Sequence, residues 1–277
     1  MARTGVIADI HGNREALNAV LAALQARGVR RIACLGDIVG YNADPDECAT
    51  IVRERRMLAI AGNHDLISIR RLGFDRCSNN AAYALRRTRR SIAAETSAYL
   101  EALPLYREIE PGVLLVHGGV RDVQQYMTNR TLIAQNAAWL REDSPEIRVC
   151  FFGHSHEQKV YQVDGDTVTD LPLTSILSLN PEKKYFINPG SVDASRKSRH
   201  KLAEFAILEG DTIEFLRVAY DAAATECKAA AFGYRIPPWA DRAYSMRKRL
   251  SRLPHKALAM SSAALRWPSV FKSRETN

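Results

Sequence analysis

The sequence predicts an α/β fold in which two mixed β-sheets lie face to face between outer helix layers, a four-layer α/β/β/α sandwich with a helical insertion. Three observations lead to this prediction. The first part alternates apolar strands with helical patterns, residues 66–103 hold helical patterns alone, and the later part holds short strands separated by turns. A chain of 277 residues, 46% hydrophobic and 25% charged, is typical of a globular protein with one large α/β domain or two small ones.

The first five predicted elements form a β-α-β-α-β series. In chain order they are a strand at Thr4–Ala8, a helix with Ala16, Leu17, Val20, Leu21 and Leu24 at helical spacing and a stop near Gly28, a strand at Arg31–Leu35, a helix at Pro45–Arg55 and a strand at Met57–Ala61. This order predicts parallel strands joined by right-handed crossovers.

The insertion at 66–103 is followed by strands and one further helix. The strands are expected at Val113–Val116, Arg148–Phe152, Gln158–Val163, Thr167–Leu171, Lys184–Ile187, Ala203–Leu208 and Thr212–Arg217, and the helix at Thr131–Arg141. Asp164-Gly165 and Glu209-Gly210 are hairpin turns, so the later strands are expected to pair antiparallel. Within the insertion, Arg86, Arg87, Arg89 and Arg90 are expected on exposed faces.

The net charge of +8 is concentrated at the C-terminal end. Residues 228–277 contain 11 Lys and Arg against 2 Asp and Glu, whereas the rest of the chain has 28 basic and 29 acidic residues. We therefore divide the chain into a main domain, 1–222, and a basic C-terminal extension, 223–277. The high isoelectric point belongs to the extension, so the nearly neutral main domain does not favour a nuclease.

A short basic amphipathic helix is expected in the extension, because Ala243, Met246, Leu250 and Leu253 recur at helical spacing among basic residues. Three interpretations are open. The helix binds an anionic membrane or nucleic acid, it docks on the main domain or on a second subunit, or it is a solvated tail.

The sequence has five cysteines, which is an odd number, and no two of them form a C-x-x-C pair. This argues against a disulfide framework and against a thiolate zinc site. A reducing cytoplasm is the simplest setting for them. The apolar start at Val6–Ala8 is interrupted by Asp9, unlike a signal-peptide core, and no stretch of 18 apolar residues occurs.

Polar residues that commonly bind metals follow one predicted strand after another. They are Asp9 and His11, then Asp37, then Asn63, His64 and Asp65, then His117, and finally His154 and His156. Because the carboxyl ends of parallel strands share one edge of a sheet, these side chains are expected to converge there. Five of the seven histidines occupy such positions, which favours a metal site over unrelated turns.

These residues resemble the motifs of the calcineurin-like metallophosphoesterase superfamily. The matching strings are DIH (Asp9–His11), GDIVGY (Gly36–Tyr41), GNHD (Gly62–Asp65), VHGG (Val116–Gly119) and GHSH (Gly153–His156). The similarity runs from about Thr4 to Arg217, and NPGS at Asn188–Ser191 is similar to the small bacterial and archaeal phosphodiesterase branch.

The resemblance implies two bound transition-metal ions, divalent or trivalent. Asp9, His11, Asp37 and His156 would hold the first ion, and Asp37, Asn63, His117 and His154 the second. Asp37 would bridge cations about 3.5–4 Å apart, which requires a carboxylate. Imidazole ligands suit manganese, our first expectation, as well as iron, zinc or nickel.

The same resemblance implies hydrolysis of a phosphodiester or a small phosphorylated metabolite by a metal-bridging hydroxide. His64 would contact the phosphoryl group and protonate the leaving oxygen, and Asp65 would orient the His64 ring. Asn63 and Arg196 are further candidate substrate contacts; for Arg196 a surface ion pair is the alternative. The implied partner is a phosphorylated small molecule or nucleotide, and the relatives place a cap over the site where residues 66–103 lie. Tyr41 and Asn42 could shape the pocket.

Two departures from the family pattern bear on the alternatives. Protein phosphatases of the superfamily have an Asp-Arg pair after the GD motif, whereas Val39, Gly40 and Tyr41 follow Asp37-Ile38 here. The phosphate-binding arginine is therefore missing, which disfavours both a protein phosphatase and a dinucleoside polyphosphatase. Asp193 and Ser195 replace Gly and Pro of the GSVGxPR pattern, so the loop that carries Arg196 is expected to differ. A non-catalytic scaffold with a membrane- or nucleic-acid-binding tail is the alternative from another class, although every predicted ligand is present.

Overall fold

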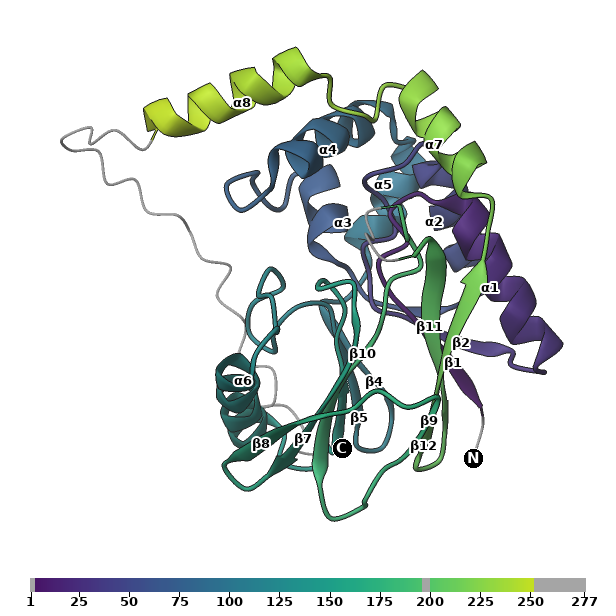
Figure 1. Cartoon of the computed structure of the whole chain (residues 1–277), viewed down its shortest axis with the longest axis vertical. Coiled ribbons are helices and arrows are strands. Elements are labelled where there is room, and N and C mark those ends of the chain that lie inside the picture. Colours follow the sequence, from purple (N-terminus) through teal and green to yellow (C-terminus); the bar gives the residue numbers. More distant parts are fainter. Residues whose placement is uncertain (1–2, 196–199, 252–277) are drawn as a thin grey trace, which may run out of the picture.

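The computed structural model describes residues 3–195 and 200–251. Two six-stranded sheets face each other, and helices cover the outer face of each (Figure 1). The predicted four-layer α/β/β/α fold is confirmed.

The first sheet contains the predicted parallel series. Its strands, in spatial order, are β3 (Leu58–Ala59), β2 (Arg31–Cys34), β1 (Thr4–Ile7), β11 (Leu202–Glu209), β12 (Thr212–Ala219) and β9 (Ile176–Ser178). Strands β1, β2 and β3 are parallel, with Val6 opposite Ala33 and Cys34 opposite Ala59, while β11, β12 and β9 pair antiparallel. The edge strand β9 was not expected from the sequence.

The second sheet repeats this plan. Its strands, in spatial order, are β4 (Tyr106–Glu110), β5 (Val113–Val116), β6 (Val149–Phe151), β10 (Lys184–Pro189), β7 (Gln158–Asp164) and β8 (Thr167–Leu171). Strands β5, β6 and β10 run parallel, and the predicted hairpin at Asp164-Gly165 joins β7 to β8. Strand β4, at the edge of this sheet, was also not expected from the sequence.

Three apolar clusters hold the layers together. Between the sheets, Val6, Leu35, Phe151, Ile187 and Ile213 are buried against one another. Helices α1 (Arg14–Ala26) and α2 (Pro45–Glu54) pack on the outer face of the first sheet, and α6 (Arg130–Asp143) packs on that of the second. Apolar burial on both faces explains why the parallel strands are continuous apolar runs.

The insertion is helical, as predicted, with α3 (Asn63–Ser68), α4 (Asn79–Ser91) and α5 (Ala94–Glu101). Its arginines, however, are not all on exposed faces. The guanidinium groups of Arg86 and Arg89 lie 4.8 and 4.4 Å from the ring centre of Phe74, and Arg89 donates to the Ile67 carbonyl. A guanidinium packs well on an aromatic face, so these two side chains hold α4 in place rather than face solvent.

Two helices of the C-terminal extension pack on the insertion and on α1. They are α7 (Ala222–Ala231), seen above α1 in Figure 1, and α8 (Pro238–Ser251), seen above α4. Asn79 at the start of α4 donates to Asp241 and Ser245, and Lys248 donates to the Cys77 carbonyl. The described part of the extension is therefore docked on the main domain; Leu253 and the residues after it lie outside the described ranges.

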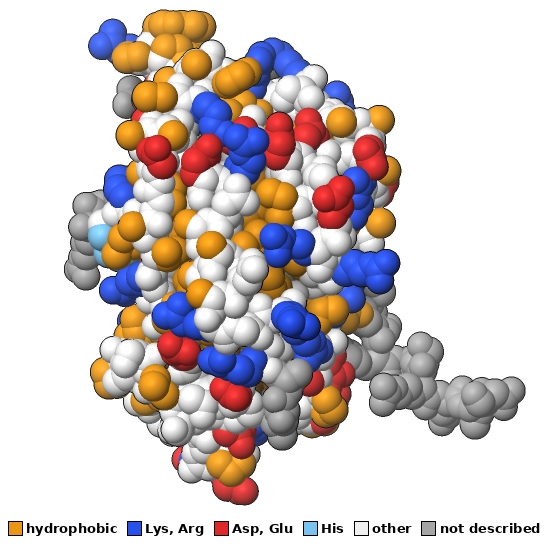
Figure 2. All heavy atoms as spheres, turned by 90° about the vertical axis from the view of Figure 1, so that its right-hand side faces the viewer, with side chains coloured by type: hydrophobic (Ala, Val, Ile, Leu, Met, Phe, Trp, Pro, Cys, Tyr) orange, Lys and Arg blue, Asp and Glu red, His pale blue; other side chains and the backbone are white. Residues whose placement is uncertain are grey.

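The surface beside α1 and α7 carries basic and acidic side chains intermingled (Figure 2). Hydrophobic side chains gather at the upper end of this view (Figure 2). Phe232 at the end of α7 and Trp239 at the start of α8 are exposed hydrophobic residues. None of the helices within 3–195 and 200–251 is both long and apolar enough to cross a bilayer.

Candidate metal centre

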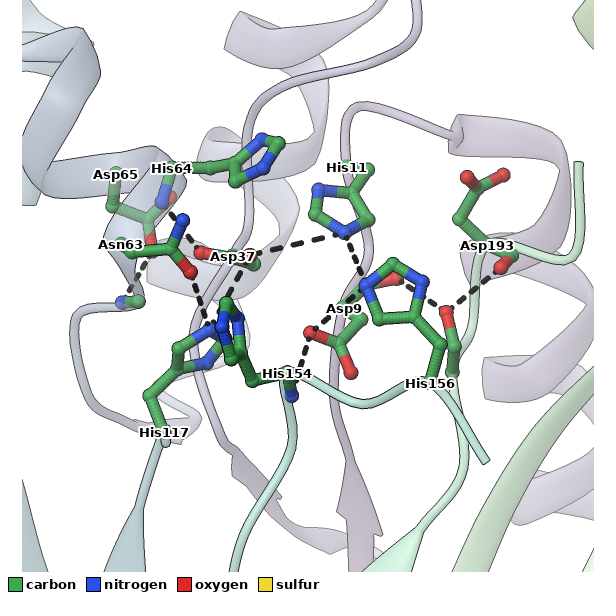
Figure 3. A network of polar contacts seen from close by, with 12 residues as sticks. Asp9, His11, Asp37, Asn63, His64, Asp65, His117, His154, His156 and Asp193 are labelled. Atoms are coloured by element: carbon green, nitrogen blue, oxygen red, sulfur yellow. Dashed lines mark hydrogen bonds and ion pairs between the residues drawn. The ribbon is translucent and has the colours of Figure 1, made fainter. Parts of the chain in front are cut away.

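The seven side chains expected to bind metal meet at the carboxyl ends of five strands (Figure 3). Asp9 and His11 follow β1, Asp37 follows β2, Asn63 begins α3 just beyond β3, His117 follows β5, and His154 and His156 follow β6. Six of these side chains are buried, while the side chain of His156 is 16% exposed. The two-sheet arrangement thus brings together residues that are up to 147 positions apart in the sequence.

One group of candidate ligands consists of Asp9, His11 and His156. The Nε2 atoms of the two imidazoles face each other at 3.1 Å, and Nε2 of His156 lies 3.7 Å from Oδ1 of Asp9. Two ring nitrogens and a carboxylate that point at one small space form a donor set for a transition-metal cation.

A second group consists of Asp37, His117 and His154. Nε2 of His117 lies 3.3 Å from Oδ2 of Asp37 and 3.0 Å from Oδ1 of Asn63, which adds an amide oxygen to this group. The same Oδ2 of Asp37 is 3.8 Å from Nε2 of His11. Asp37 therefore lies between the two groups, as a ligand shared by two cations must.

The electrostatics of the centre depend on Asp37. Burial opposes its ionisation, but the charges of His117 and His64 outweigh burial and hold its pKa well below the ordinary value. Burial also favours neutral His117, yet Asp37 raises the pKa of this imidazole to about 9. For His154, burial and the charge of His117 together lower the pKa to about 3, so its ring is neutral and suited to ligation.

Oδ2 of Asp37 and Nε2 of His154 are buried polar atoms of the centre that make no hydrogen bond within the described chain. A buried polar group without a hydrogen bond is costly, and a ligated cation would remove that cost. The residues therefore fit transition-metal ions; if two ions bind, Asp9, His11, Asp37 and His156 would hold one and Asp37, Asn63, His117 and His154 the other.

Hydrogen bonds outside the two groups fix how the ligands point. Nδ1 of His117 donates to the Leu35 carbonyl at 2.7 Å, which directs Nε2 toward Asp37. The His64 amide donates to Oδ1 of Asp37 at 2.7 Å, leaving Oδ2 for the centre. A Cβ at Gly62 would stand 2.2 Å from that same Oδ1, so only glycine allows the loop before α3 to approach this closely.

The backbone of the centre adopts an uncommon conformation. Five of the candidate ligands have a φ in the left-handed region: Asp9, His11, Asp37, His154 and His156, with values between 52° and 64°. Among non-glycine residues of the described chain only Arg56 and Arg70 share this feature. Such residues cluster where a function fixes the direction of a side chain, because the left-handed region costs about 1–2 kcal/mol per residue.

His64 and Asp65 occupy different surroundings. The ring of His64 is buried, with its centre 4.5 Å from that of His11 and 4.7 Å from that of Tyr41. The carboxylate of Asp65 accepts from three backbone amides, those of Ile38, Val39 and Gly62, at 2.9–3.1 Å. Both oxygens of Asp65 therefore tie together the loops after β2 and β3, and a role for Asp65 in orienting the His64 ring stays a prediction.

The loop after β10 differs from the family pattern for a visible reason. Asp193 is fully buried, and its carboxylate accepts from Asn13 Nδ2 at 2.8 Å and from Ser195 Oγ at 2.7 Å. Its backbone amide donates to the Asp9 carbonyl. Asp193 and Ser195 thus tie this loop to the start of α1 and to the first ligand. Arg196 lies outside the described residues.

Three residues that lie near the centre were not identified as candidate site residues from the sequence. The ring of Tyr126 lies 3.9 Å from that of His154 and is 53% exposed, which puts an aromatic face at the surface beside the ligands. Thr88 of α4 donates to the Gly40 carbonyl, and Arg235 of the extension donates to the Tyr41 carbonyl. Residue type and spacing carry no signal for these contacts, since each joins distant segments.

A family model gives the decisive comparison. The model of the calcineurin-like phosphoesterase superfamily domain matches residues 2–212. The chain belongs to this superfamily. In this calcineurin-like phosphoesterase, the matched residues include every candidate metal ligand and every strand except β12, of which only the first residue is matched. Helices α7 and α8 and the rest of the extension lie beyond the match.

Individual proteins agree with this assignment. An uncharacterised protein of Methanocaldococcus jannaschii is 33% identical over 240 residues, which cover 84% of this chain and 93% of that protein. The crystal structure of a metallophosphoesterase from Sphaerobacter thermophilus is 31% identical, covers 88% of this chain and 98% of that one, and has a TM-score of 0.71. A hypothetical protein of Pyrococcus horikoshii shares the fold, with a TM-score of 0.65, 18% identity, and coverage of 87% of this chain and 97% of that one.

Proposed function

We propose that this calcineurin-like phosphoesterase is a dinuclear metal-dependent enzyme that hydrolyses a phosphodiester or a small phosphorylated metabolite, with manganese as the preferred metal. The observation that carries the proposal is the position of Asp37, whose Oδ2 lies 3.3 Å from one group of ligands and 3.8 Å from the other. When bound, two such ions supply positive charge to the phosphoryl oxygens and make water nucleophilic near neutral pH.

Besides holding the ions, two residues of the chain have roles of their own: Asn63 adds a neutral ligand to one donor set, and His64 supplies a proton. Asn63 presents its amide oxygen to His117 at 3.0 Å and is a neutral member of the donor set, which leaves the ion it binds more electrophilic. His64 stands beside the ligands, with its ring centre 4.5 Å from that of His11. We assign to His64 the contact with the phosphoryl group and the transfer of a proton to the leaving oxygen.

A diester is favoured over a phosphoprotein by the loop after β2. Val39, Gly40 and Tyr41 follow Asp37-Ile38 in the segment where protein phosphatases have an Asp-Arg pair, and none of the three is an arginine. A fork of charge-assisted hydrogen bonds to a doubly charged phosphomonoester is therefore missing at this position. A diester carries one negative charge and needs less neutralisation.

A metal-supplemented activity screen tests the proposal. The protein is loaded separately with manganese, iron, zinc and nickel, its metal content is measured, and hydrolysis of bis-p-nitrophenyl phosphate is compared with that of p-nitrophenyl phosphate. We expect close to two ions per chain and a higher kcat/KM for the diester, with manganese giving the highest rate. Two bound ions without turnover of any ester would instead indicate a non-catalytic metal-binding protein.

We expect His64→Ala to lower kcat for bis-p-nitrophenyl phosphate about 10²–10⁴-fold, the usual contribution of a positioned general acid. The metal content should stay that of the wild type. This second measurement is needed because a ring nitrogen of His64 also lies within 4.8 Å of ligand atoms of His11 and Asp37. His200→Ala, at a partly exposed histidine beside Glu204, is the control. Loss of one ion in His64→Ala would make His64 a ligand and refute the role assigned here.

A further inference from the structure

A cavity of about 270 Å³ lies between the insertion, the C-terminal extension and the loops of the metal centre. Its walls come from four segments: the loop after β2, the start of α4, the loop after β10, and α7 with the chain that follows it. The side chains that matter are Tyr41, Asn80, Ser195, Glu226, Tyr234 and Arg235. Half of these residues belong to the extension, which lies outside the part of the chain that defines the superfamily.

Two walls of the cavity also contact the candidate ligands. The ring centre of Tyr41 lies 4.7 Å from that of His11. On the other side, Ser195 donates to the carboxylate of Asp193, whose amide donates to the Asp9 carbonyl. A group in the cavity would therefore lie next to a phosphoryl group held at the metal centre. In Figure 3, His11 and Asp193 are seen on the same side of the centre, away from His117.

Arg235 fixes one wall before any ligand arrives. Its guanidinium donates to the Tyr41 carbonyl at 2.9 Å and to Oδ1 of Asn42 at 3.0 Å. It also makes two hydrogen bonds with the carboxylate of Glu226, at 2.8 and 2.6 Å. This bidentate pair balances the charge of Arg235, so the cavity is not built to select a second anion. A wall held in this way lowers the entropy lost when a ligand binds.

The lining combines aromatic faces with hydrogen-bonding groups. Tyr41 and Tyr234 are buried tyrosines, Asn80 offers an amide, and Glu226 offers carboxylate oxygens at the exposed edge. A planar ring with a polar edge can contact the small exposed parts of the two tyrosine rings and bond to the amide, while a carboxylate accepts hydrogen bonds from sugar hydroxyls. An acyl chain would leave these polar groups without partners, which is costly.

We propose that this cavity binds an organic group of the phosphoester substrate and that this group is a nucleoside. The inference rests on the proposed phosphoesterase function and adds the class of substrate. The cavity volume is slightly below the range of about 300–1,000 Å³ found for drug-sized ligands, which suits a single nucleoside rather than an oligonucleotide or a protein segment. The extension thus acts as a specificity element beside the metal centre.

Binding of free nucleosides to the metal-free full-length protein is the first test. Adenosine and thymidine are titrated in a calorimeter against wild type and against Asn80→Trp, which fills the cavity from an exposed position at the start of α4. We expect binding by the wild type and at least tenfold weaker binding by Asn80→Trp. Gln25→Trp, which places the same ring on an exposed site of α1, should bind like the wild type. No binding of either nucleoside by the wild type, or equal binding by Asn80→Trp, would overturn the proposal.

Kinetic selectivity is the second test, with the manganese-loaded enzyme. The ratio of kcat/KM for thymidine 5′-(p-nitrophenyl phosphate) to that for methyl p-nitrophenyl phosphate should fall at least tenfold in Asn80→Trp and less in Asn80→Leu. The leucine variant keeps the branched shape and the number of side-chain heavy atoms of Asn80 and removes its hydrogen bonds, and melting curves establish that both variants fold. An unchanged ratio in both variants would contradict the proposal.

The two tests separate this proposal from the proposed function. Nucleoside binding without hydrolysis of any ester would support the cavity assignment and refute the phosphoesterase activity. Hydrolysis of diesters with no preference for the nucleoside ester, and no binding of nucleosides, would leave the activity intact and refute the cavity assignment.

Discussion

Replacing Asp37 with asparagine is expected to lower kcat/KM for bis-p-nitrophenyl phosphate at least about a thousandfold, because the carboxylate belongs to both groups of ligands at once. Its Oδ2 lies 3.3 Å from Nε2 of His117 and 3.8 Å from Nε2 of His11. Asparagine keeps the shape of the side chain but removes its negative charge, so it cannot balance two cations. Metal content measured by mass spectrometry should fall along with the rate.

The control for this experiment is Asp166→Asn, in the turn between β7 and β8. That carboxylate is 97% exposed and pairs with Arg141 at 3.0 Å, so its loss should leave rate and metal content near the wild-type values. An Asp37→Asn protein that retained both ions and the wild-type rate would rule out a shared carboxylate as the basis of the centre.

The second large effect is expected on stability, from Asp65→Ala. The substitution leaves the buried amides of Ile38, Val39 and Gly62 without their acceptor. Since each unsatisfied buried group costs about 1–3 kcal/mol, we expect the free energy of unfolding to fall by about 3–5 kcal/mol. Denaturant unfolding of the metal-free protein, followed by circular dichroism, measures this change without interference from bound ions.

Asp46→Ala provides the comparison. This aspartate also accepts a backbone amide, that of Ala93 at 3.0 Å, but the contact is exposed, so we expect a loss below about 1 kcal/mol. Equal losses in the two variants would show that Asp65 does not hold the loops after β2 and β3 together.

The convergence of the candidate ligands could be predicted from the sequence because it follows from topology. Parallel pairing places Asp9 and Asp37 at one edge of the first sheet and His117 and His154 at one edge of the second, and the predicted face-to-face packing of the sheets lets the two edges meet. The helical character of 66–103 was equally clear, since spacing within a helix is a local property. Membership of the superfamily followed from the same motifs.

What could not be predicted depends on contacts between distant segments. The edge strands β4 and β9 are short and only partly apolar, and their pairing is fixed by neighbours far away in the sequence. Asp65 is next to His64 in sequence, yet its acceptors face amides that only the folded loops bring within reach. Arg235 reaches Tyr41 across 194 positions, and no pattern in the sequence connects the two.

The candidate ligands Asp9, His11, Asp37, His154 and His156 have a left-handed backbone, so the geometry that the site needs lowers the stability of the folded protein. An L-amino acid in this conformation stores free energy that glycine would not, so the chain is less stable than its packing alone would make it. Selection for resistance to heat would favour glycine at these five positions, and selection for turnover forbids it. Efforts to stabilise this protein should therefore begin at sites remote from the strand ends.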